Sequence, residues 1–185
     1  MTNVEMKLPE AEKVSINVEK SAVLVLDISQ EHCTDPKFGC SKIVPGLKKF
    51  LDRAREVGLP IIHTISYRLR GTPGGQVHPD LMRRPLEPVL YPDAFDKFAG
   101  GELQQFLDLH GAETLIITGF RSNISVLNTA TKATRELKYN VVIPMDGIAA
   151  YNDFEKDYTL YHFTVLPAQA SRLFTYTRLE MISFS

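Results

Sequence analysis

The sequence predicts an α/β fold built on a parallel sheet, and three observations support this fold class. Apolar runs of strand length alternate along the chain with segments of helical periodicity. Residues 115–144 contain a strand, a polar loop, a helix and a second strand, which together make one βαβ unit. The run 22–28 is almost continuously apolar, as a strand buried on both faces requires. We therefore expect parallel strands joined by right-handed crossovers.

The elements are predicted in order along one domain that spans residues 1–185. Residues 1–20 are polar and should form an N-terminal arm. The predicted strands are 22–28, 60–65, 88–91, 115–118, 141–144 and 172–175. The predicted helices are 44–57, 102–110, one that opens at about Ser122, and 153–166, and a final turn covers 179–182. The segment 67–86 is rich in glycine and proline without periodicity, so we expect a mobile loop over one end of the sheet.

Composition excludes several classes of function. The chain has 185 residues and a net charge of −1, so no basic field favours nucleic acid or an anionic membrane. No apolar run is long enough to cross a membrane, and the N-terminus lacks the apolar core of a signal peptide. Cys33 and Cys40 are expected to be free thiols, which suits a reducing compartment. These observations together predict a cytoplasmic protein.

Two polar residues follow predicted strands and are the candidates for chemistry. Asp27 closes the first apolar run, and Ser125 lies one turn into the helix of the βαβ unit. Because open parallel sheets bind ligands at the carboxyl ends of their strands, both residues should border one crevice, with Arg121 and Asn123 beside them. Arg121 could bind a substrate carboxylate with its forked donors. The structural alternatives are a loop-capping role for Asp27 and close helix packing for Ser125.

The segment TGFRSNISVLNTA resembles the nucleophile segment of the isochorismatase-like hydrolases, a cysteine hydrolase superfamily that includes nicotinamidases. The family pattern is roughly T-G-x-x-[ST]-[DN]-x-C-V-x-x-T-A, and this chain has Ser125 where the family has its cysteine. The matching positions are Thr118, Gly119, Ser122, Asn123, Val126, Thr129 and Ala130. The segment AVLVLDISQEH is similar to the first family strand, whose catalytic Asp corresponds to Asp27. In EPVLYPDAFDKFAGGELQQFL, aligned without a gap, the family's catalytic lysine corresponds to Pro92.

The resemblance implies a three-layer, Rossmann-like doubly wound sheet of six strands in the order 3-2-1-4-5-6, with helices on both faces. It implies that Asp27 takes the nucleophile's proton, that the peptide bond before Arg121 is often cis, and that the protein forms a homodimer or homotetramer. Pro92 carries no charge and would leave the lysine's role empty. Lys97 could reach the site from its loop, although a solvated surface lysine is the favoured interpretation.

Other polar residues give weaker signals. Cys33 could be a relocated nucleophile, but a buried inert thiol is favoured. His63 and His78 stand alone without a metal-ligand pattern, so we expect no metal, and we expect no cofactor. The tyrosines Tyr67 and Tyr91 are candidates for lining the crevice, and Arg68 and Arg70 could do so as well.

The sequence leaves two functions open. One is a small-molecule hydrolase that lacks the family's cysteine and lysine, with weak activity or acid–base hydrolysis that depends on Asp27. The alternative is a catalytically inactive protein on the same scaffold that binds a small molecule or serves in an assembly. A nucleotide-binding Rossmann protein is disfavoured, because the only glycine cluster, Gly71–Gly75, does not have the required spacing.

Overall fold

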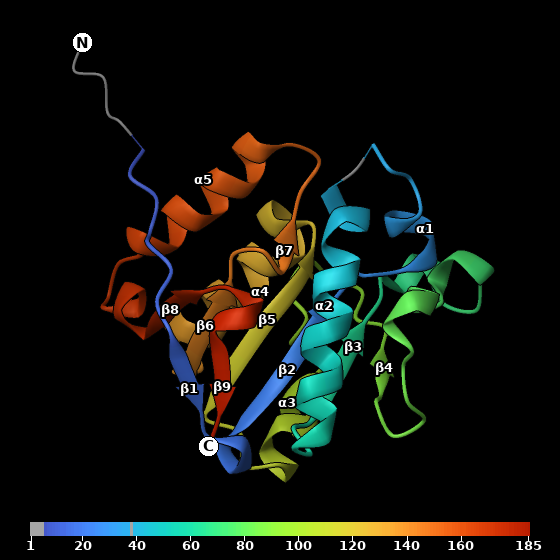
Figure 1. Cartoon of the computed structure of the whole chain (residues 1–185), viewed down its shortest axis with the longest axis horizontal. Coiled ribbons are helices and arrows are strands. Elements are labelled where there is room, and N and C mark those ends of the chain that lie inside the picture. Colours follow the sequence, from blue (N-terminus) through green and yellow to red (C-terminus); the bar gives the residue numbers. More distant parts are fainter. Residues whose placement is uncertain (1–5, 38) are drawn as a thin grey trace.

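A parallel sheet forms the centre of the structure, a computed structural model that describes residues 6–37 and 39–185. The strands follow the order β4-β3-β2-β5-β6-β8, and every neighbouring pair is parallel. Their bounds are β2 (Ser21–Leu26), β3 (Ile61–Thr64), β4 (Val89–Leu90), β5 (Thr114–Phe120), β6 (Asn140–Pro144) and β8 (Phe174–Thr177). If these six strands are numbered 1 to 6 along the chain, their order in the sheet is the predicted 3-2-1-4-5-6. Figure 1 shows the connections that cross between them.

Three short strands lie outside that prediction. Strand β7 (Ile148–Ala149) pairs with the end of β5. Strand β1 (Val14–Ile16) pairs in parallel with β9 (Ile182–Phe184), so the predicted arm and the C-terminal segment form a small sheet of their own. Residues 1–5 of the predicted arm lie outside the described residues. Strands of two or three residues are too short for their side-chain alternation to be read from sequence.

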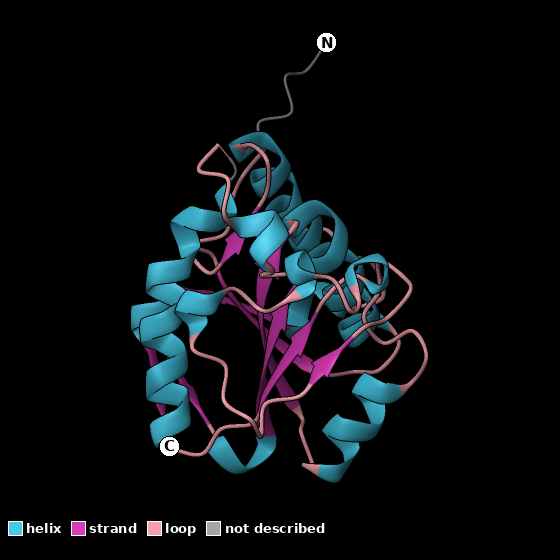
Figure 2. Ribbon diagram, turned by 90° about the vertical axis from the view of Figure 1, so that its right-hand side faces the viewer, coloured by secondary structure: helices cyan, strands magenta, loops and turns pink. Residues whose placement is uncertain are grey.

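Helices cover both faces of the sheet, which confirms the three-layer arrangement (Figure 2). One face carries α2 (Gly39–Glu56), preceded by the short α1 (Gln30–Cys33). The other face carries α3 (Glu102–Leu109), α4 (Leu127–Arg135) and α5 (Asp153–Thr164). The strands supply both layers of core, because successive side chains alternate between faces. On β2, Val23 and Val25 pack towards α2, whereas Leu24 and Leu26 pack towards the other three helices.

The loop 67–86 is more ordered than its composition predicted. It contains three 3-10 helices, Tyr67–Leu69, Pro73–Gly75 and Pro79–Leu81. Leu69 and Leu81 are buried, so the loop is packed against the rest of the protein. None of the described helices is long and apolar enough to cross a membrane.

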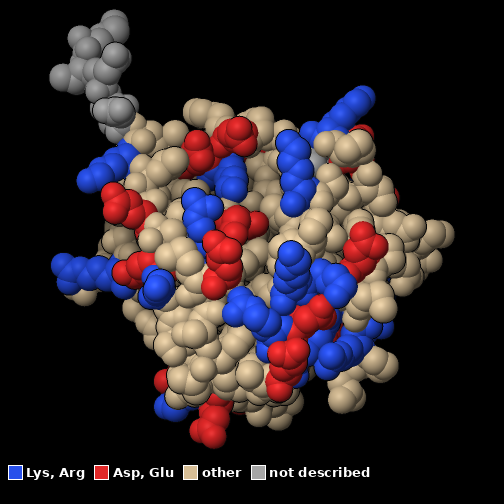
Figure 3. Space-filling model, viewed as in Figure 1, with Lys and Arg blue, Asp and Glu red and all other residues tan. Residues whose placement is uncertain are grey.

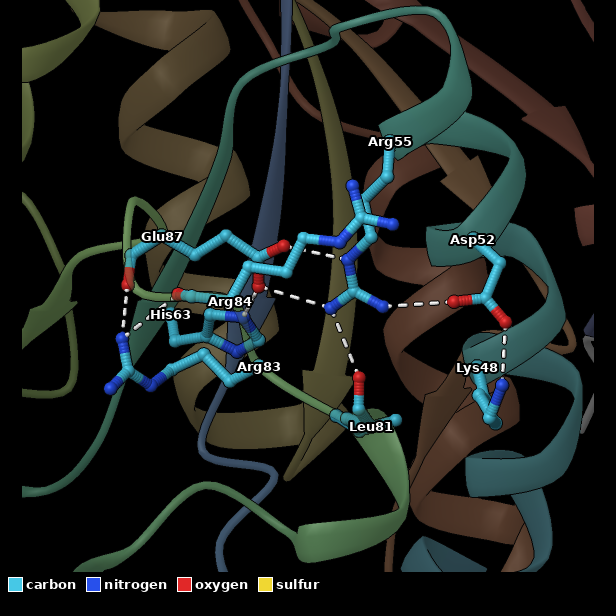
Figure 4. Close-up of polar contacts among 8 residues, drawn as sticks. All are labelled: Lys48, Asp52, Arg55, His63, Leu81, Arg83, Arg84 and Glu87. Carbon is cyan, nitrogen blue, oxygen red and sulfur yellow. Dashed lines mark hydrogen bonds and ion pairs between the residues drawn. The ribbon is translucent and has the colours of Figure 1, made fainter.

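A buried polar cluster fixes this loop and β3 against α2 (Figure 4). The Glu87 carboxylate accepts hydrogen bonds from Arg55 of α2, at 2.6 and 3.0 Å, and contacts His63 Nε2 of β3 at 3.0 Å. Burial alone would raise the pKa of Glu87, but hydrogen bonds from His63 and Arg55 outweigh it and lower that pKa to about 2. Burial lowers the pKa of His63, against the opposing effect of Glu87. His63 is therefore not the isolated histidine that the sequence indicated.

The prediction of two free thiols is wrong in this structure. Cys33 at the end of α1 and Cys40 at the start of α2 form a disulfide. The two residues are seven positions apart and both are buried, and the bridge ties α1 to the first turn of α2. Free thiols therefore no longer support the predicted cytoplasmic location, which stays a prediction.

Candidate active site

Asp27 is placed immediately after β2 in an unusual backbone conformation. Its φ angle is 54°, in the left-handed region that non-glycine residues seldom occupy, although Asp and Asn occupy it more readily than most. Its backbone N–H donates to the Thr64 carbonyl of β3 at 2.8 Å. The chain thus leaves β2 with the carboxylate turned to the carboxyl end of the sheet, and Asp27 remains only 5% exposed.

Gly119 brings the neighbouring strand against Asp27. In the β2–β5 register Gly119 is the partner of Leu26, and its φ angle is 137°. A Cβ atom at this position would lie 2.2 Å from the Leu26 carbonyl oxygen, which no other residue type could accept without movement of the backbone. The ends of β2 and β5 can therefore approach more closely than side chains would permit.

Ser125 then reaches Asp27 from the segment that follows β5. Residues Ser122–Val126 form one turn of π-helix that continues into α4, and such turns are frequent at functional sites. The Ser125 hydroxyl donates a hydrogen bond to Asp27 Oδ2, across 98 residues of sequence. The predicted proximity of Asp27 and Ser125 is confirmed, while their catalytic roles stay predictions. The Phe120–Arg121 peptide bond is cis, as the resemblance implied.

The expectation that Lys97 is a solvated surface residue is wrong, because Lys97 lies in the site. Its Nζ lies 2.8 Å from Asp27 Oδ2, and its side chain is 3% exposed, so it is not a solvated surface lysine. Its backbone N–H donates to Thr129 Oγ1 of α4 at 3.1 Å, which holds this part of the 92–101 loop over the sheet. A gapless alignment assigns the family lysine to Pro92, which also borders the site. An ammonium is nevertheless present beside Asp27, supplied from five positions further along the chain.

These three side chains line a cavity of about 680 Å³. The remaining lining residues come from α1, the segment after β3, the loop after β4, the turn after β5, and the start of the α5 region. They are His32, Ser66, Arg68, Pro92, Asp93, Ala94, Phe95, Phe120, Arg121, Ile124 and Tyr151. A cavity of this size suits a small organic molecule.

Arg121 borders the cavity as predicted. Its guanidinium carbon lies 4.4 Å above the centre of the Tyr151 ring, and its Nη2 is 3.9 Å from Glu155 Oε1. Its Nε is buried and has no hydrogen-bond partner in the described structure. Tyr151 in turn meets Phe120 edge to face at 5.3 Å, so aromatic rings hold the guanidinium in place.

Four other candidates for lining the crevice, Arg70 among them, are absent from the cavity wall. Asn123 is absent from its wall, although the next two residues, Ile124 and Ser125, line it. Tyr67 is 48% exposed, and its neighbours Ser66 and Arg68 face the cavity instead. Tyr91 packs beneath the guanidinium of Arg70 at 5.6 Å, which keeps its ring outside the wall.

His32 and Tyr151 are cavity residues that sequence reasoning missed. His32 follows Asp27 by five positions, and Ser29 three positions before it gives the short capped helix α1. The pattern Ser-x-x-His after a strand could have signalled a histidine near Asp27. Tyr151 had no such signal, because it reaches the site through the turn after β7. Within the described residues, no three His, Cys, Asp or Glu side chains gather as a possible metal site.

The charge on the face that carries α2 is mixed. Figure 3 shows Lys and Arg interspersed with Asp and Glu on the face that carries α2, without a large area of one sign. This distribution on the visible face gives no support to binding of a polyanion such as nucleic acid.

Comparison with known proteins places this geometry in context. The family model described as the isochorismatase domain matches residues 21–170. A streptothricin hydrolase from Streptomyces noursei is 29% identical over 139 residues, which cover 71% of this chain and 50% of that protein. The chain therefore spans about half the length of this curated relative.

Solved structures show the same fold. An isochorismatase family protein from Burkholderia thailandensis superposes with a TM-score of 0.76 at 21% identity, over 92% of this chain and 97% of that one. An N-carbamoylsarcosine amidase from Thermoplasma acidophilum gives a TM-score of 0.72 at 23% identity, over 87% of this chain and 97% of that one.

Proposed function

Since the chain belongs to the isochorismatase family, we propose that it is a hydrolase of a small organic molecule in which Ser125 takes the place of the family's cysteine. The observation that carries this proposal is the contact of Ser125 and Lys97 with one oxygen of Asp27 in the wall of a cavity. A hydroxyl, a carboxylate and an ammonium in hydrogen-bond contact are the parts that a covalent hydrolysis needs.

Each residue has a role that follows from its contacts. The Asp27 carboxylate accepts the Ser125 proton as Oγ attacks the substrate carbonyl carbon. It then gives that proton to the leaving group when the bond to carbon breaks. Lys97 holds the carboxylate in place and keeps a positive charge near the oxyanion that develops on the carbonyl oxygen. Because a hydroxyl is a much poorer nucleophile than a thiolate, we expect slower turnover than a cysteine at position 125 would give.

Arg121 is proposed to bind a carboxylate of the substrate. Its guanidinium is held against Tyr151, and the 3.9 Å separation from Glu155 is too long for a hydrogen bond. The unpartnered Nε–H and the neighbouring Nη–H groups are therefore free to form the forked pair that guanidinium makes with carboxylates. The cavity and this cation together favour a small carboxylate-bearing substrate.

The proposal is tested by turnover on small amides. We would assay nicotinamide and N-carbamoylglycine, the second also as its uncharged amide, with the wild type and with Ser125→Ala, Ser125→Cys and Asp27→Asn. Slow wild-type hydrolysis of the carboxylate-bearing compound is expected. It should be lost in Ser125→Ala and Asp27→Asn and raised in Ser125→Cys. Arg121→Gln should raise KM for N-carbamoylglycine and leave KM for its amide little changed.

A catalytically inactive binding protein is the alternative, and the presence of serine at the nucleophile position favours it. Hydrolysis that survives Ser125→Ala would rule out the nucleophile role. An inactive wild type that gains no activity in Ser125→Cys would favour the binding protein.

A cytoplasmic homodimer or homotetramer, without nucleic-acid partners, remains part of the proposal. Light scattering coupled to gel filtration would test the oligomeric state. Thiol titration of protein isolated under conditions that trap free thiols would test the compartment, because a disulfide between Cys33 and Cys40 in most molecules would contradict a reducing one.

A further inference from the structure

An imidazole in the cavity wall has a buried nitrogen that the structure leaves without a partner. His32 lines the cavity together with Asp27 and Ser125. Its Nδ1 is buried and makes no hydrogen bond within the described structure. Burial of a polar atom without a partner is unfavourable, so such an atom in a native protein indicates a bound water, a ligand or a catalytic role.

The backbone holds this ring firmly at its place. The His32 N–H donates to the Ser29 side-chain oxygen at 3.2 Å, and Ser29 is fully buried. The imidazole packs on the Phe120 ring, with centroids 5.8 Å apart. The next residue, Cys33, is joined by its disulfide to Cys40 of α2, so the end of α1 is covalently tied. His32 is thus positioned as a fixed part of the wall.

Serine hydrolases generally depend on an imidazole to accept protons near neutral pH. In this site Oδ2 of Asp27 already contacts both the Ser125 hydroxyl and the Lys97 ammonium. We propose that His32 is a second acid–base residue, which activates the water that hydrolyses the acyl-enzyme on Ser125. This rests on the proposed function, because it requires an acyl group on the serine.

The proton and electron balance is as follows. When water attacks the acyl carbon, its oxygen forms the new C–O bond and one of its protons passes to the imidazole of His32. Collapse of the tetrahedral intermediate breaks the bond between the acyl carbon and Ser125 Oγ. The proton then returns from His32 to Oγ, which leaves a free carboxylic acid, a neutral imidazole and the serine hydroxyl. No oxidant, metal or further reactant is needed.

The charged groups near His32 come from its own helix, from the elements that pack against it and from the cavity wall. On its own helix, Glu31 is paired with Arg68 at 2.9 Å. The 3-10 helix Pro73–Gly75, which packs on α1, has no ionisable side chain. Lys42 near the start of α2 lines a separate hollow. Six other ionisable side chains share the cavity with His32: Asp27, Arg68, Asp93, Lys97, Arg121 and Tyr151.

The test separates formation of the acyl-enzyme from its hydrolysis. We would use 4-nitrophenyl acetate, because 4-nitrophenolate leaves as an anion and needs no proton. Acetylation of Ser125 would be followed by intact-protein mass spectrometry, and loss of the acetyl group would be timed after the reagent is removed. The proteins are the wild type, His32→Phe, His32→Gln and Ser125→Ala. Phe preserves the packing on Phe120, whereas Gln preserves hydrogen bonding without proton exchange near neutrality.

We expect both His32 variants to become acetylated at close to the wild-type rate and to lose the acetyl group on the order of 10²–10⁴-fold more slowly. Melting temperatures close to that of the wild type would show that the fold is intact.

Two results would overturn the proposal in distinguishable ways. Deacetylation at the wild-type rate in His32→Phe, or full recovery in His32→Gln, would remove the acid–base role of His32 and leave the serine nucleophile in place. A wild-type protein that is not acetylated at Ser125, or that is acetylated equally in Ser125→Ala, would remove the proposed function itself and this inference with it.

Discussion

Replacement of Lys97 by methionine should destabilise the protein far more than loss of an ordinary surface lysine. Its Nζ lies 2.8 Å from Asp27 Oδ2, and the two side chains are only 3% and 7% exposed. The other carboxylate oxygen, Oδ1, is buried and has no hydrogen-bond partner in the part of the chain that the structure describes. Methionine fills a similar volume and removes the charge, so among the described residues Asp27 would keep the Ser125 hydroxyl as its only side-chain partner. A buried charge left in this way costs about 3–5 kcal/mol of folding free energy.

A double-mutant cycle measures the pair itself. Asp27→Asn alone should also destabilise, because it leaves the buried Lys97 ammonium beside a neutral amide. The double variant Asp27→Asn/Lys97→Met removes both charges, so its loss should fall below the sum of the single losses by roughly 1–3 kcal/mol. Asparagine is the suitable replacement because it tolerates the left-handed backbone of residue 27.

The assay is urea unfolding at neutral pH with linear extrapolation. The change in unfolding free energy is taken from the shift of the urea midpoint, with the dependence of free energy on urea concentration unchanged. Lys132→Met is the matched control, since Lys132 also pairs with an aspartate, Asp96, at 3.0 Å, but its side chain is 33% exposed. Its loss should be within about 1 kcal/mol. Two results would contradict this reasoning: a loss in Lys97→Met no larger than in the control, or single losses that add up to the loss of the double variant. Either would show that Lys97 and Asp27 do not form a desolvated ion pair, and Lys97 would then have no place in the proposed catalytic arrangement.

Two further changes test the framework of the site. Gly119→Ala should destabilise by roughly 3 kcal/mol or more in urea unfolding, because its Cβ would lie 2.2 Å from the Leu26 carbonyl oxygen. Gly58→Ala is the control. Gly58 also has a positive φ, +75°, but a Cβ atom built there has no described atom within 4 Å, so this change should cost only about 1–2 kcal/mol. Equal losses of stability in Gly119→Ala and Gly58→Ala would contradict the close approach of β2 and β5. Folding lowers the pKa of Glu87 from 4.5 to about 2, so the carboxylate contributes about 3 kcal/mol that is fully present above pH 4.5 and lost as pH falls towards 2. Glu87→Gln should remove this contribution at pH 7 and flatten stability between those pH values, and an unchanged acid profile would show that Glu87 is not the group responsible.

The strand order and the juxtaposition of Asp27 with Ser125 could be predicted because both follow from local pattern and chain connectivity. Buried parallel strands such as 22–28 are long apolar runs that polar loops interrupt clearly. The handedness of crossovers and the resemblance to a doubly wound family then place the ends of the first and fourth predicted strands side by side. Asp27 and Ser125 each stand directly beyond such an end, so their meeting requires no knowledge of side-chain packing.

The rest of the site depends on tertiary contacts that sequence spacing does not encode. Lys97 reaches Asp27 because its loop is held on Thr129, and a gapless alignment instead assigned its role to Pro92. Asn123 was misplaced because it lies in the π-helical turn Ser122–Val126, which the sequence did not predict and which decides where each side chain points. The disulfide was missed because two cysteines seven positions apart match no disulfide framework, and cysteines in a reducing compartment are ordinarily free thiols.

Covalent labelling of Ser125 by a fluorophosphonate is the measurement that tests the central claim most directly. The reagent phosphonylates an activated serine hydroxyl and expels fluoride, so it needs no knowledge of the natural substrate. Mass spectrometry should find one label per chain on Ser125, none in Ser125→Ala, and slower labelling in Asp27→Asn and Lys97→Met. A wild-type chain that stays unlabelled under conditions that label a known serine hydrolase would contradict the claim that Asp27 and Lys97 activate Ser125.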